Sequence, residues 1–376
     1  MFCKVLEILL VKGGGVVNIF SCKTKVVSGN GSVAYLKKLP ISRLLLVTDP
    51  YFMENGTALK VAQNSGAGQW EIFSKVTPDP SVELAAEGTA LVRQFQPDTV
   101  VALGGGSAMD CAKAMVHFSK MELQFVAIPT TSGSGSEVTD FAILTHENVK
   151  HPLVDERLCP DVAILDGDFL TNLPRGLIAD SGFDVLSHAL ESYVAKDGGF
   201  FTDALAKEAF CVALAALPAS FSGNTALRQR MHDAATMAGM AFTKAGLGLC
   251  HAMSHTLGGA FHIPHGRLNA ILLPAVVECN ANLCGDKYAR LARAAGLSGA
   301  ADAVAVRNLK NALVRLRKEL GLPQTLKEAG VDPRQVWHKT DSLVSDVLKD
   351  PCCKTNPMPV EAFMVRRILE EVTGRV

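Results

Sequence analysis

Histidines are concentrated in one short stretch of this 376-residue chain. Four of its ten histidines fall between His251 and His265. His251 and His255 are four residues apart and share one face if the segment is helical, while His265 follows a proline and can fold back towards them. Imidazole is the commonest side-chain metal ligand, and it binds metals in its neutral form near pH 7. The clustering therefore favours a metal site, and the alternative is a set of capped or surface histidines.

A second segment, GFDVLSHALE, pairs a carboxylate with an imidazole. Asp184 and His188 are four residues apart, so one helical face presents both side chains. On an otherwise apolar helix this placement is costly unless a cation compensates the charge. With His251 and His265 the set is one aspartate and three histidines, which suits a divalent first-row metal such as Fe(II) or Zn(II). A buried Asp–His ion pair between helices is the alternative.

Two loops rich in hydrogen-bond donors each follow an apolar, strand-like run. Residues 104–107, GGGS, lie between the run TVVAL and a helical segment, whose free N–H groups can meet a phosphate. Residues 130–136, TTSGSGS, follow the run at 125–128. Two such loops at the carboxyl ends of strands predict a nucleotide crevice, although the Rossmann fingerprint G-x-G-x-x-G is absent and a tight turn is the alternative for GGGS.

Asp49 follows another apolar run, at 43–48. A carboxylate at a strand end can accept hydrogen bonds from a ribose diol, and it would repel a 2′-phosphate, which favours NAD over NADP. A turn-forming role before Pro50 is the alternative.

The remaining pattern predicts an α/β N-terminal domain with a parallel, Rossmann-like sheet and an all-α C-terminal domain. We expect strands at 43–48, 70–76, 99–103, 125–128, 141–144 and 162–165, with helices at 32–39, 56–63, 81–95 and 107–118. After Pro174 strand-like runs vanish. We expect helices there at 182–194, 202–221, 225–245, 249–258, 267–280, 287–295, 301–320, 333–348 and 360–372.

Composition limits the class of protein. Lys+Arg and Asp+Glu both number 37, so no charge excess points to nucleic acid or to an anionic membrane surface. The longest apolar runs look too short or too interrupted to span a bilayer. Ten cysteines, with no C-x-x-C, indicate the free thiols of a reducing cytoplasm.

Residues 1–16 are an unusual leader, with an apolar stretch followed by Gly13-Gly14-Gly15 and no small-residue cleavage site. We interpret them as spurious or disordered, with the true start near Val16 or Val17. The expected domains are then residues 17–173, α/β and nucleotide-binding, and residues 174–376, helical and metal-binding.

At these motifs the chain resembles the iron-containing (group III) alcohol dehydrogenases, from about residue 18 to its C-terminus. The matching segments are GGGSAMDCAKA, PTTSGSGSEVT, PDVAILD, GFDVLSHALE and GLGLCHAMSHTLGGAFHIPHG. Within the family it is most similar to the short-chain enzymes of propanediol- and ethanolamine-utilisation operons.

The resemblance implies an active site in the cleft between the two domains. It implies that a divalent metal, Fe(II) or alternatively Zn(II), is bound by Asp184, His188, His251 and His265. It implies NAD contacts from Gly105, Gly106, Ser107, Asp110, Thr130, Thr131, Ser134 and Lys150. His255 falls at the family's non-ligand histidine beside the substrate, and Asp79 stands where many members have asparagine. Members also dimerise through an N-terminal strand, here expected around residues 17–27.

The expected reaction is the reversible, metal- and NAD-dependent oxidation of short-chain primary alcohols such as propanol and ethanol, with His255 relaying the proton. The alternatives are a lactaldehyde/1,2-propanediol or 1,3-propanediol oxidoreductase of the same family, a dehydroquinate-synthase-like lyase, and an assembly protein with a decayed site. We expect a homodimer or higher homo-oligomer in the cytoplasm. One option is that it is packed in a bacterial microcompartment together with other microcompartment enzymes. We expect no nucleic-acid or membrane partner.

Overall fold

The N-terminal half is built on a six-stranded parallel sheet. The computed structural model describes residues 19–147 and 149–375 of the chain, so the leader at 1–16 lies outside the described residues. The sheet has the order β1-β8-β5-β4-β2-β3. Its strands are β1 (Lys25–Ser28), β2 (Arg43–Val47), β3 (Gln69–Phe73), β4 (Thr99–Gly104), β5 (Gln124–Pro129) and β8 (Val162–Leu165).

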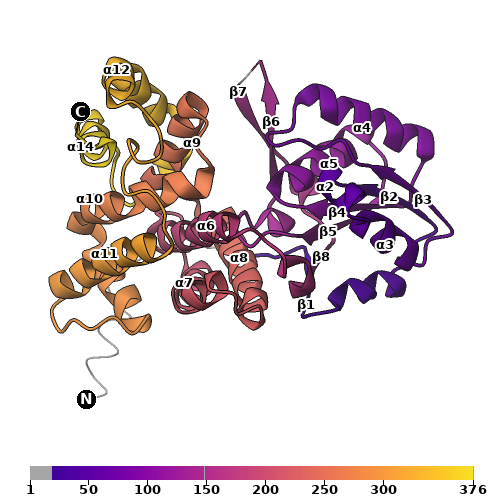
Figure 1. The fold of residues 1–376 in the computed structure, drawn as a ribbon, viewed down its shortest axis with the longest axis horizontal. Helices are drawn as coiled ribbons and strands as arrows, with labels where there is room; N and C mark the ends of the chain where they lie inside the picture. The colour runs from indigo at the N-terminus through magenta and orange to yellow at the C-terminus, as the bar shows by residue number, and fades with distance from the viewer. Residues whose placement is uncertain (1–18, 148, 376) are drawn as a thin grey trace.

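Helices cover both faces of this sheet, as Figure 1 shows. They are η1 (Ser32–Lys38), α2 (Pro50–Glu54), α3 (Thr57–Asn64), α4 (Val82–Phe95) and α5 (Gly106–Ser119), with short 3₁₀ turns η2 (Ser136–Val138), η3 (Glu156–Leu158) and η4 (Gly167–Leu170). Alternate residues of β2 serve the two faces: Leu45 packs in the cluster with α4 and α5, while Leu44 packs with η1 and α3. This two-sided burial explains the continuous apolar runs in the sequence.

The chain crosses from β3 at one edge back over β2 to β4, so the winding direction reverses between β2 and β4. In open parallel sheets, ligands bind outside the carboxyl ends of the strands at such a switch point. Asp49 follows β2 and Gly105 follows β4, so the order of the strands brings these two predicted residues to one crevice.

The strand expected at 141–144 was placed in the wrong sheet. It is longer, β6 (Phe141–His146), and pairs antiparallel with an unpredicted strand, β7 (Val149–Val154), in a separate two-stranded sheet. The hairpin stands on the side of the α/β half that faces α9 (Figure 1). The N-terminal strand expected around 17–27 is confirmed only at its end, because β1 begins at Lys25.

The second half is helical, as predicted. Its helices are α6 (Arg175–Val194), α7 (Phe200–Phe221), α8 (Ala226–Ala245), α9 (Leu249–Phe261), α10 (His265–Ala294), α11 (Asp302–Glu319), α12 (Pro333–Lys349), α13 (Cys352–Thr355) and α14 (Ala362–Thr373). The two helices expected at 267–280 and 287–295 are one, α10, interrupted by a non-helical residue at Cys284. The short helix α13 was not predicted.

Two helices, α7 and α10, are long and apolar enough to cross a membrane, although the apolar runs were expected to be too short or too interrupted. Both pack among other helices of this half, and two thirds of the most apolar stretch of α10 is buried. Core helices of this kind can be equally long and apolar, so these two give only weak evidence of a span. The nine cysteines among the described residues are all free thiols, as expected.

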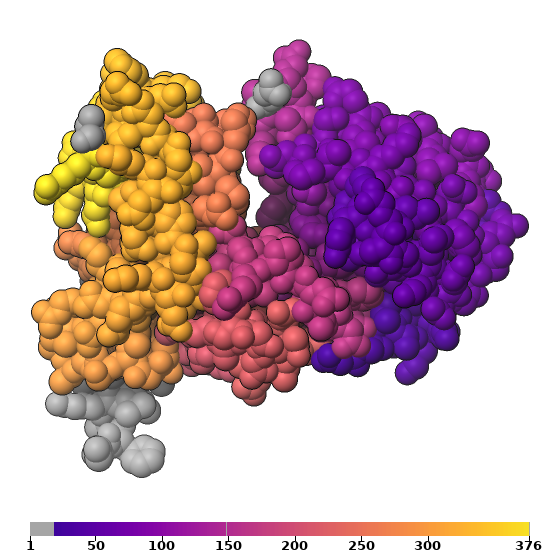
Figure 2. Space-filling model, viewed as in Figure 1, coloured from indigo at the N-terminus to yellow at the C-terminus, as the bar shows by residue number. Residues whose placement is uncertain are grey.

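The two halves meet along α8, which contacts η2, η4 and β8. Above this contact Figure 2 shows an open cleft between the α/β half and the helices around α9. The predicted histidines lie on the helical side of that cleft.

Candidate metal centre and nucleotide loops

One aspartate and three histidines from three helices converge on a single point. Asp184 Oδ1 lies 3.8 Å from His188 Nε2, 3.9 Å from His251 Nε2 and 3.6 Å from His265 Nε2. Oxygen and nitrogen ligands at about 2.0–2.2 Å from a tetrahedral metal would be separated by about 3.3–3.6 Å. Asp184, His188 and His251 offer ligand atoms that all lie within 4.8 Å of one another, and His265 reaches the same Asp184 oxygen, so the structure places the four predicted ligand residues together where a divalent cation would fit.

The local sequence explains how three helices approach so closely. A Cβ at Gly266 would lie 2.0 Å from the carbonyl oxygen of Asp180, so only glycine lets the start of α10 meet α6. His265, the first residue of α10, is thereby turned towards Asp184. His188 is held between two rings, with ring centroids 4.5 Å from His251 and 4.4 Å from Phe242.

Burial sets the charge of these groups. Burial would raise the pKa of Asp184, but the surrounding His188, His251 and His265 hold it well below its usual range. Burial lowers the pKa of His188 to about 4, so its ring is neutral near pH 7. Burial opposes charge on His251 too, yet the neighbouring carboxylates of Asp184 and Glu191 raise its pKa to about 9. A cation at the centre would replace that proton, so metal binding releases a proton here.

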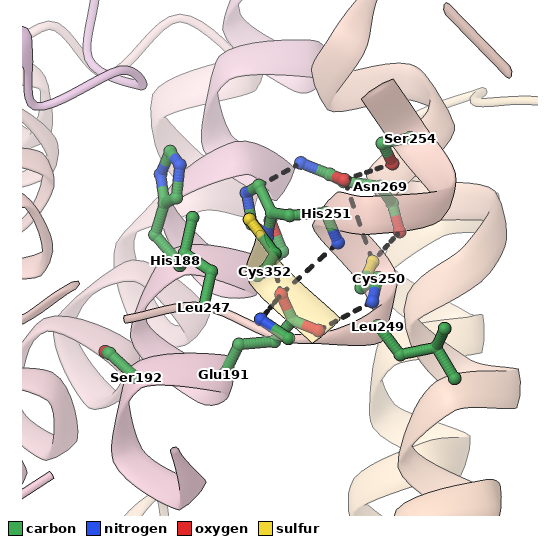
Figure 3. A network of polar contacts seen from close by, with 12 residues as sticks. His188, Glu191, Ser192, Leu247, Leu249, Cys250, His251, Ser254, Asn269 and Cys352 are labelled. Atoms are coloured by element: carbon green, nitrogen blue, oxygen red, sulfur yellow. Dashed lines mark hydrogen bonds and ion pairs between the residues drawn. The ribbon is translucent and has the colours of Figure 1, made fainter. Parts of the chain in front are cut away.

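Glu191, which the sequence analysis did not assign, orients His251. Its Oε2 lies 2.6 Å from His251 Nδ1, and both side chains are almost fully buried, with exposures of 2% and 1%. Because a carboxylate only accepts, Nδ1 keeps a hydrogen, and Nε2, beside Asp184, is the nitrogen that would give up its proton to bind a metal. Glu191 also accepts from the N–H groups of Gly248 (3.0 Å) and Cys250 (2.6 Å), which are free at the start of α9 (Figure 3).

Asn269 fixes the orientation of Asp184, the carboxylate of the candidate metal centre. It is fully buried, and its Nδ2 donates to Asp184 Oδ1 at 2.8 Å. Its amide orientation is set by Ser254, whose hydroxyl donates to Asn269 Oδ1 (Figure 3). Asp184 therefore presents its oxygen to the three imidazoles from a fixed position.

His255 lies one turn after His251 but stands outside the set of four. Its side chain is 44% exposed, and its Nδ1 lies 2.8 Å from Asp350 Oδ2. Its ring stacks on that of His265, with centroids 5.3 Å apart. Burial would raise the pKa of Asp350, but His255 and the Cys352 N–H hold it below its usual range. The carboxylate is therefore ionised and holds the exposed imidazole beside the centre.

The two predicted nucleotide loops lie against each other. Gly105 is the N-cap of α5 and Gly106 its first residue. A Cβ on Gly105 would come within 3.3 Å of Thr131 Oγ1, and one on Gly106 within 3.4 Å of Ser134 Cβ. Thr130 N donates to Gly104 O at 2.9 Å. Free N–H groups at the start of α5, which includes Ser107, are thus framed by hydroxyls, as phosphate binding requires.

Asp49 serves as turn former and also faces this crevice. Its Oδ1 accepts from Phe52 N at 3.2 Å, capping α2. Its Oδ2 would lie 3.7 Å from a Cβ on Gly104. Burial raises the pKa of this carboxyl. Both roles considered from the sequence remain compatible with this position.

The helical half contacts the second nucleotide loop, residues 130–136, directly through α8. His232, on α8, is 1% exposed, and its Nε2 lies 3.1 Å from Pro129 O. A carbonyl only accepts, so Nδ1 accepts in turn from Ser132 Oγ at 3.1 Å. Gly239, farther along α8, contacts the same loop: a Cβ on Gly135 of the loop would lie 2.7 Å from Gly239 Cα, so the two backbones touch.

Asp110 and Lys150 already have partners in the structure. Asp110 accepts from Ser136 Oγ (2.9 Å) and Ile143 N (3.1 Å), and burial raises its pKa. Lys150, on the exposed hairpin strand β7, pairs with Asp79 at 2.6 Å. The aspartate at position 79 thus has a local partner.

Family models match both halves of the chain. The model described as iron-containing alcohol dehydrogenase matches residues 23–167, and the C-terminal model of the Fe-containing alcohol dehydrogenase family matches residues 178–373. The chain belongs to the iron-containing alcohol dehydrogenase family. It is an oxidoreductase that interconverts alcohols and aldehydes with NAD.

Particular relatives cover the chain almost end to end. The 1-propanol dehydrogenase PduQ of Citrobacter freundii is 40% identical, covering 94% of this chain and 99% of its own length. The structure of an iron-containing alcohol dehydrogenase from Thermococcus thioreducens is 32% identical, with a TM-score of 0.87 over 94% of this chain and 99% of that one. Sulfoacetaldehyde reductase from Bifidobacterium kashiwanohense, solved with NAD⁺, is 26% identical, with a TM-score of 0.86 over 95% and 99%.

Proposed function

We propose that this enzyme interconverts short-chain primary alcohols and aldehydes, with propanol and propanal preferred over ethanol and acetaldehyde. The observation that carries the proposal is the set of four ligands packed against aromatic rings: Phe242 stacks on His188, and the ring centroids of Phe141 and Phe242 are 6.2 Å apart. We propose that these two rings form an apolar wall of the substrate pocket. The identity with 1-propanol dehydrogenase supports the chain length. An apolar wall favours an unsubstituted alkyl chain over the hydroxyl-bearing lactaldehyde, 1,2-propanediol or 1,3-propanediol.

The metal is held by Asp184, His188, His251 and His265. Three imidazoles and one carboxylate contain no thiolate, which suits Fe(II), with Zn(II) as the alternative. When bound, the cation supplies Lewis acidity that lowers the pKa of the alcohol hydroxyl. Glu191 and Asn269 keep His251 and Asp184 in their binding orientations.

The NAD pyrophosphate lies on the loop of Gly105, Gly106 and Ser107 at the start of α5. Thr130, Thr131 and Ser134 line the second phosphate and the nicotinamide side, with Asp110 beyond them. Asp49 accepts from the ribose diol and disfavours NADP, and Lys150 reaches the ribose by leaving Asp79. When bound, NAD would supply the hydride acceptor, and the free N–H groups at the start of α5 would neutralise its phosphate charge.

His255 relays the proton of the alcohol to solvent. Its ring reaches the cleft beside the ligand set and is partly exposed, so it can exchange protons with water. Asp350 accepts from Nδ1–H and thereby leaves the Nε2 lone pair free to take a proton.

The test is a panel of C2–C4 aldehydes, lactaldehyde and 3-hydroxypropanal, assayed with NADH and NADPH on enzyme loaded with Fe(II) or Zn(II) of measured content. We expect propanal to give the highest kcat/KM, NADH to exceed NADPH, and the Fe(II) form to be the more active. A preference for lactaldehyde or 3-hydroxypropanal would contradict the proposed substrate.

The enzyme works as a homodimer or larger homo-oligomer in the cytoplasm, and, as the similarity to PduQ suggests, packed in a microcompartment. Strand β1 is at the edge of the sheet, with a neighbour on one side only among the described strands, which leaves a row of backbone groups open to a second copy. Residues 17–173 and 174–376 form its two domains. Light scattering that gave a monomer mass would contradict the dimer.

A further inference from the structure

A second group of metal-binding side chains lies beside the first. The ligand atoms of His255, Asp350 and Cys352 all lie within 4.8 Å of one another. His255 comes from α9, Asp350 is the C-cap of α12, and Cys352 begins α13. None of the three belongs to the set of four around Asp184.

The turn that carries Asp350 and Cys352 is fixed by bonds of its own. Asp350 Oδ1 accepts from Cys352 N at 2.8 Å. Thr355, at the end of α13, donates to Leu247 O at 2.7 Å, and the fully buried Asn356 accepts from Leu249 N at 3.1 Å. The turn is therefore held against the start of α9 without help from His255, so the three donors are already assembled.

We propose that His255, Asp350 and Cys352 form a second zinc site, of lower affinity than the first, and that zinc bound there inhibits the enzyme. One nitrogen, one oxygen and one sulfur donor, with water as the fourth ligand, suit tetrahedral zinc. Nitrogen and oxygen ligands of zinc lie about 3.4 Å apart, so the 2.8 Å contact of His255 with Asp350 has to open by about 0.6 Å. The Cys352 thiol loses its proton to solvent on binding.

The lower affinity follows from the neighbouring centre. The rings of His255 and His265 are stacked, with centroids 5.3 Å apart and planes 14° from parallel, so cations on the two rings repel each other. Inhibition follows because a neutral His255 ring bound to zinc through Nδ1 carries its one proton on Nε2, which then has no lone pair to take a proton from the alcohol. The inhibition rests on the proposed proton role of His255, whereas zinc binding does not.

The experiment loads the first centre with Fe(II), dialyses the enzyme anaerobically against rising Zn²⁺, and measures iron and zinc per chain. We expect one zinc per chain in addition to retained iron, with activity falling over the same zinc range. Cys352→Ala and Asp350→Asn should weaken this zinc binding at least tenfold. Cys353→Ala is the matched control, because the Cys353 thiol instead donates to Val347 O at 3.1 Å and is outside the cluster. Each variant is compared with its own activity before zinc is added.

Co²⁺ in place of Zn²⁺ gives a second readout, since a thiolate ligand produces a sulfur-to-cobalt charge-transfer band that should be lost in Cys352→Ala and kept in Cys353→Ala. Zinc that only displaces iron, or that binds Cys352→Ala as tightly as the unchanged enzyme, would overturn the site. Zinc that binds as expected without inhibiting would overturn the inhibitory role and the His255 relay, and leave the site.

Discussion

Helix α9 carries two histidines one turn apart, each paired with a carboxylate from another helix, Glu191 of α6 or Asp350 at the end of α12. The two pairs differ mainly in access to water. His251 and Glu191 are 1% and 2% exposed, whereas His255 and Asp350 are 44% and 12% exposed. In both pairs the carboxylate engages Nδ1 and leaves Nε2 free. The buried pair can only hold a ligand still, while the open pair can exchange a proton with solvent. The same pairing thus serves a fixed ligand in one environment and a mobile proton in the other.

Removing a ligand should have the largest effect. His265→Ala should lose metal and activity together, with activity down on the order of a thousandfold, because the metal supplies several kcal/mol of charge stabilisation. Metal analysis and NADH oxidation with propanal measure the two losses. Full metal content in this variant would show that His265 is not a ligand.

Removing the open histidine should separate turnover from metal. His255→Ala should keep its metal and lose about a hundredfold in kcat, the usual contribution of a proton-transfer group. His262→Asn is a suitable control, since His262 is exposed and in the left-handed conformation that asparagine tolerates. Unchanged kinetics of His255→Ala across pH would remove the relay.

Changing the buried carboxylate should weaken the metal rather than the chemistry. Glu191→Gln should lower metal affinity about 10- to 100-fold, because the amide no longer fixes His251 by accepting at both oxygens. The lost caps at the start of α9 should also lower the free energy of unfolding by about 1–3 kcal/mol. Competition with a chelator and thermal unfolding measure these separately, and unchanged metal affinity would contradict the orienting role.

Changing the open carboxylate should have the smallest effect. Asp350→Asn should keep the catalytic metal and lose about tenfold in kcat, since His255 remains but its orientation is less fixed. The variant carrying both Asp350→Asn and His255→Ala should be no slower than His255→Ala alone, because Asp350 acts through His255. Additive losses would mean that Asp350 acts independently.

The sequence predicted elements with local patterns well and long-range partners poorly. Spacing of four residues brought Asp184 and His188 onto one face, and the helix expected at 81–95 is α4 (Val82–Phe95). Glu191 had a local signal that was not used, since it lies seven residues after Asp184 on the same helix. Asp350 had none, because it meets His255 across 95 residues of chain.

The misplaced strand β6 has a similar physical reason. Its length and apolar pattern resemble those of a sheet strand, yet its partner is the mostly exposed β7, which has a weak apolar pattern. Pairing between β6 and β7, rather than either strand alone, decides which sheet they form. Likewise, nothing near His232 in the sequence indicated that it would bond to the loop after β5.

Helix α8 connects the nucleotide loop at 130–136 with the candidate metal centre. One part of it holds Ser132 and Gly135 of the nucleotide loop, and Phe242 near its end stacks on the metal-side His188. Replacing Phe242 with a smaller residue to admit bulkier aldehydes would therefore also weaken the contacts that hold the nucleotide loop in place. The β6–β7 hairpin couples the two sides in the same way, because it carries both Phe141 beside Phe242 and the Ile143 N–H that holds Asp110, so a wider substrate range would require α8 and the hairpin to be redesigned together.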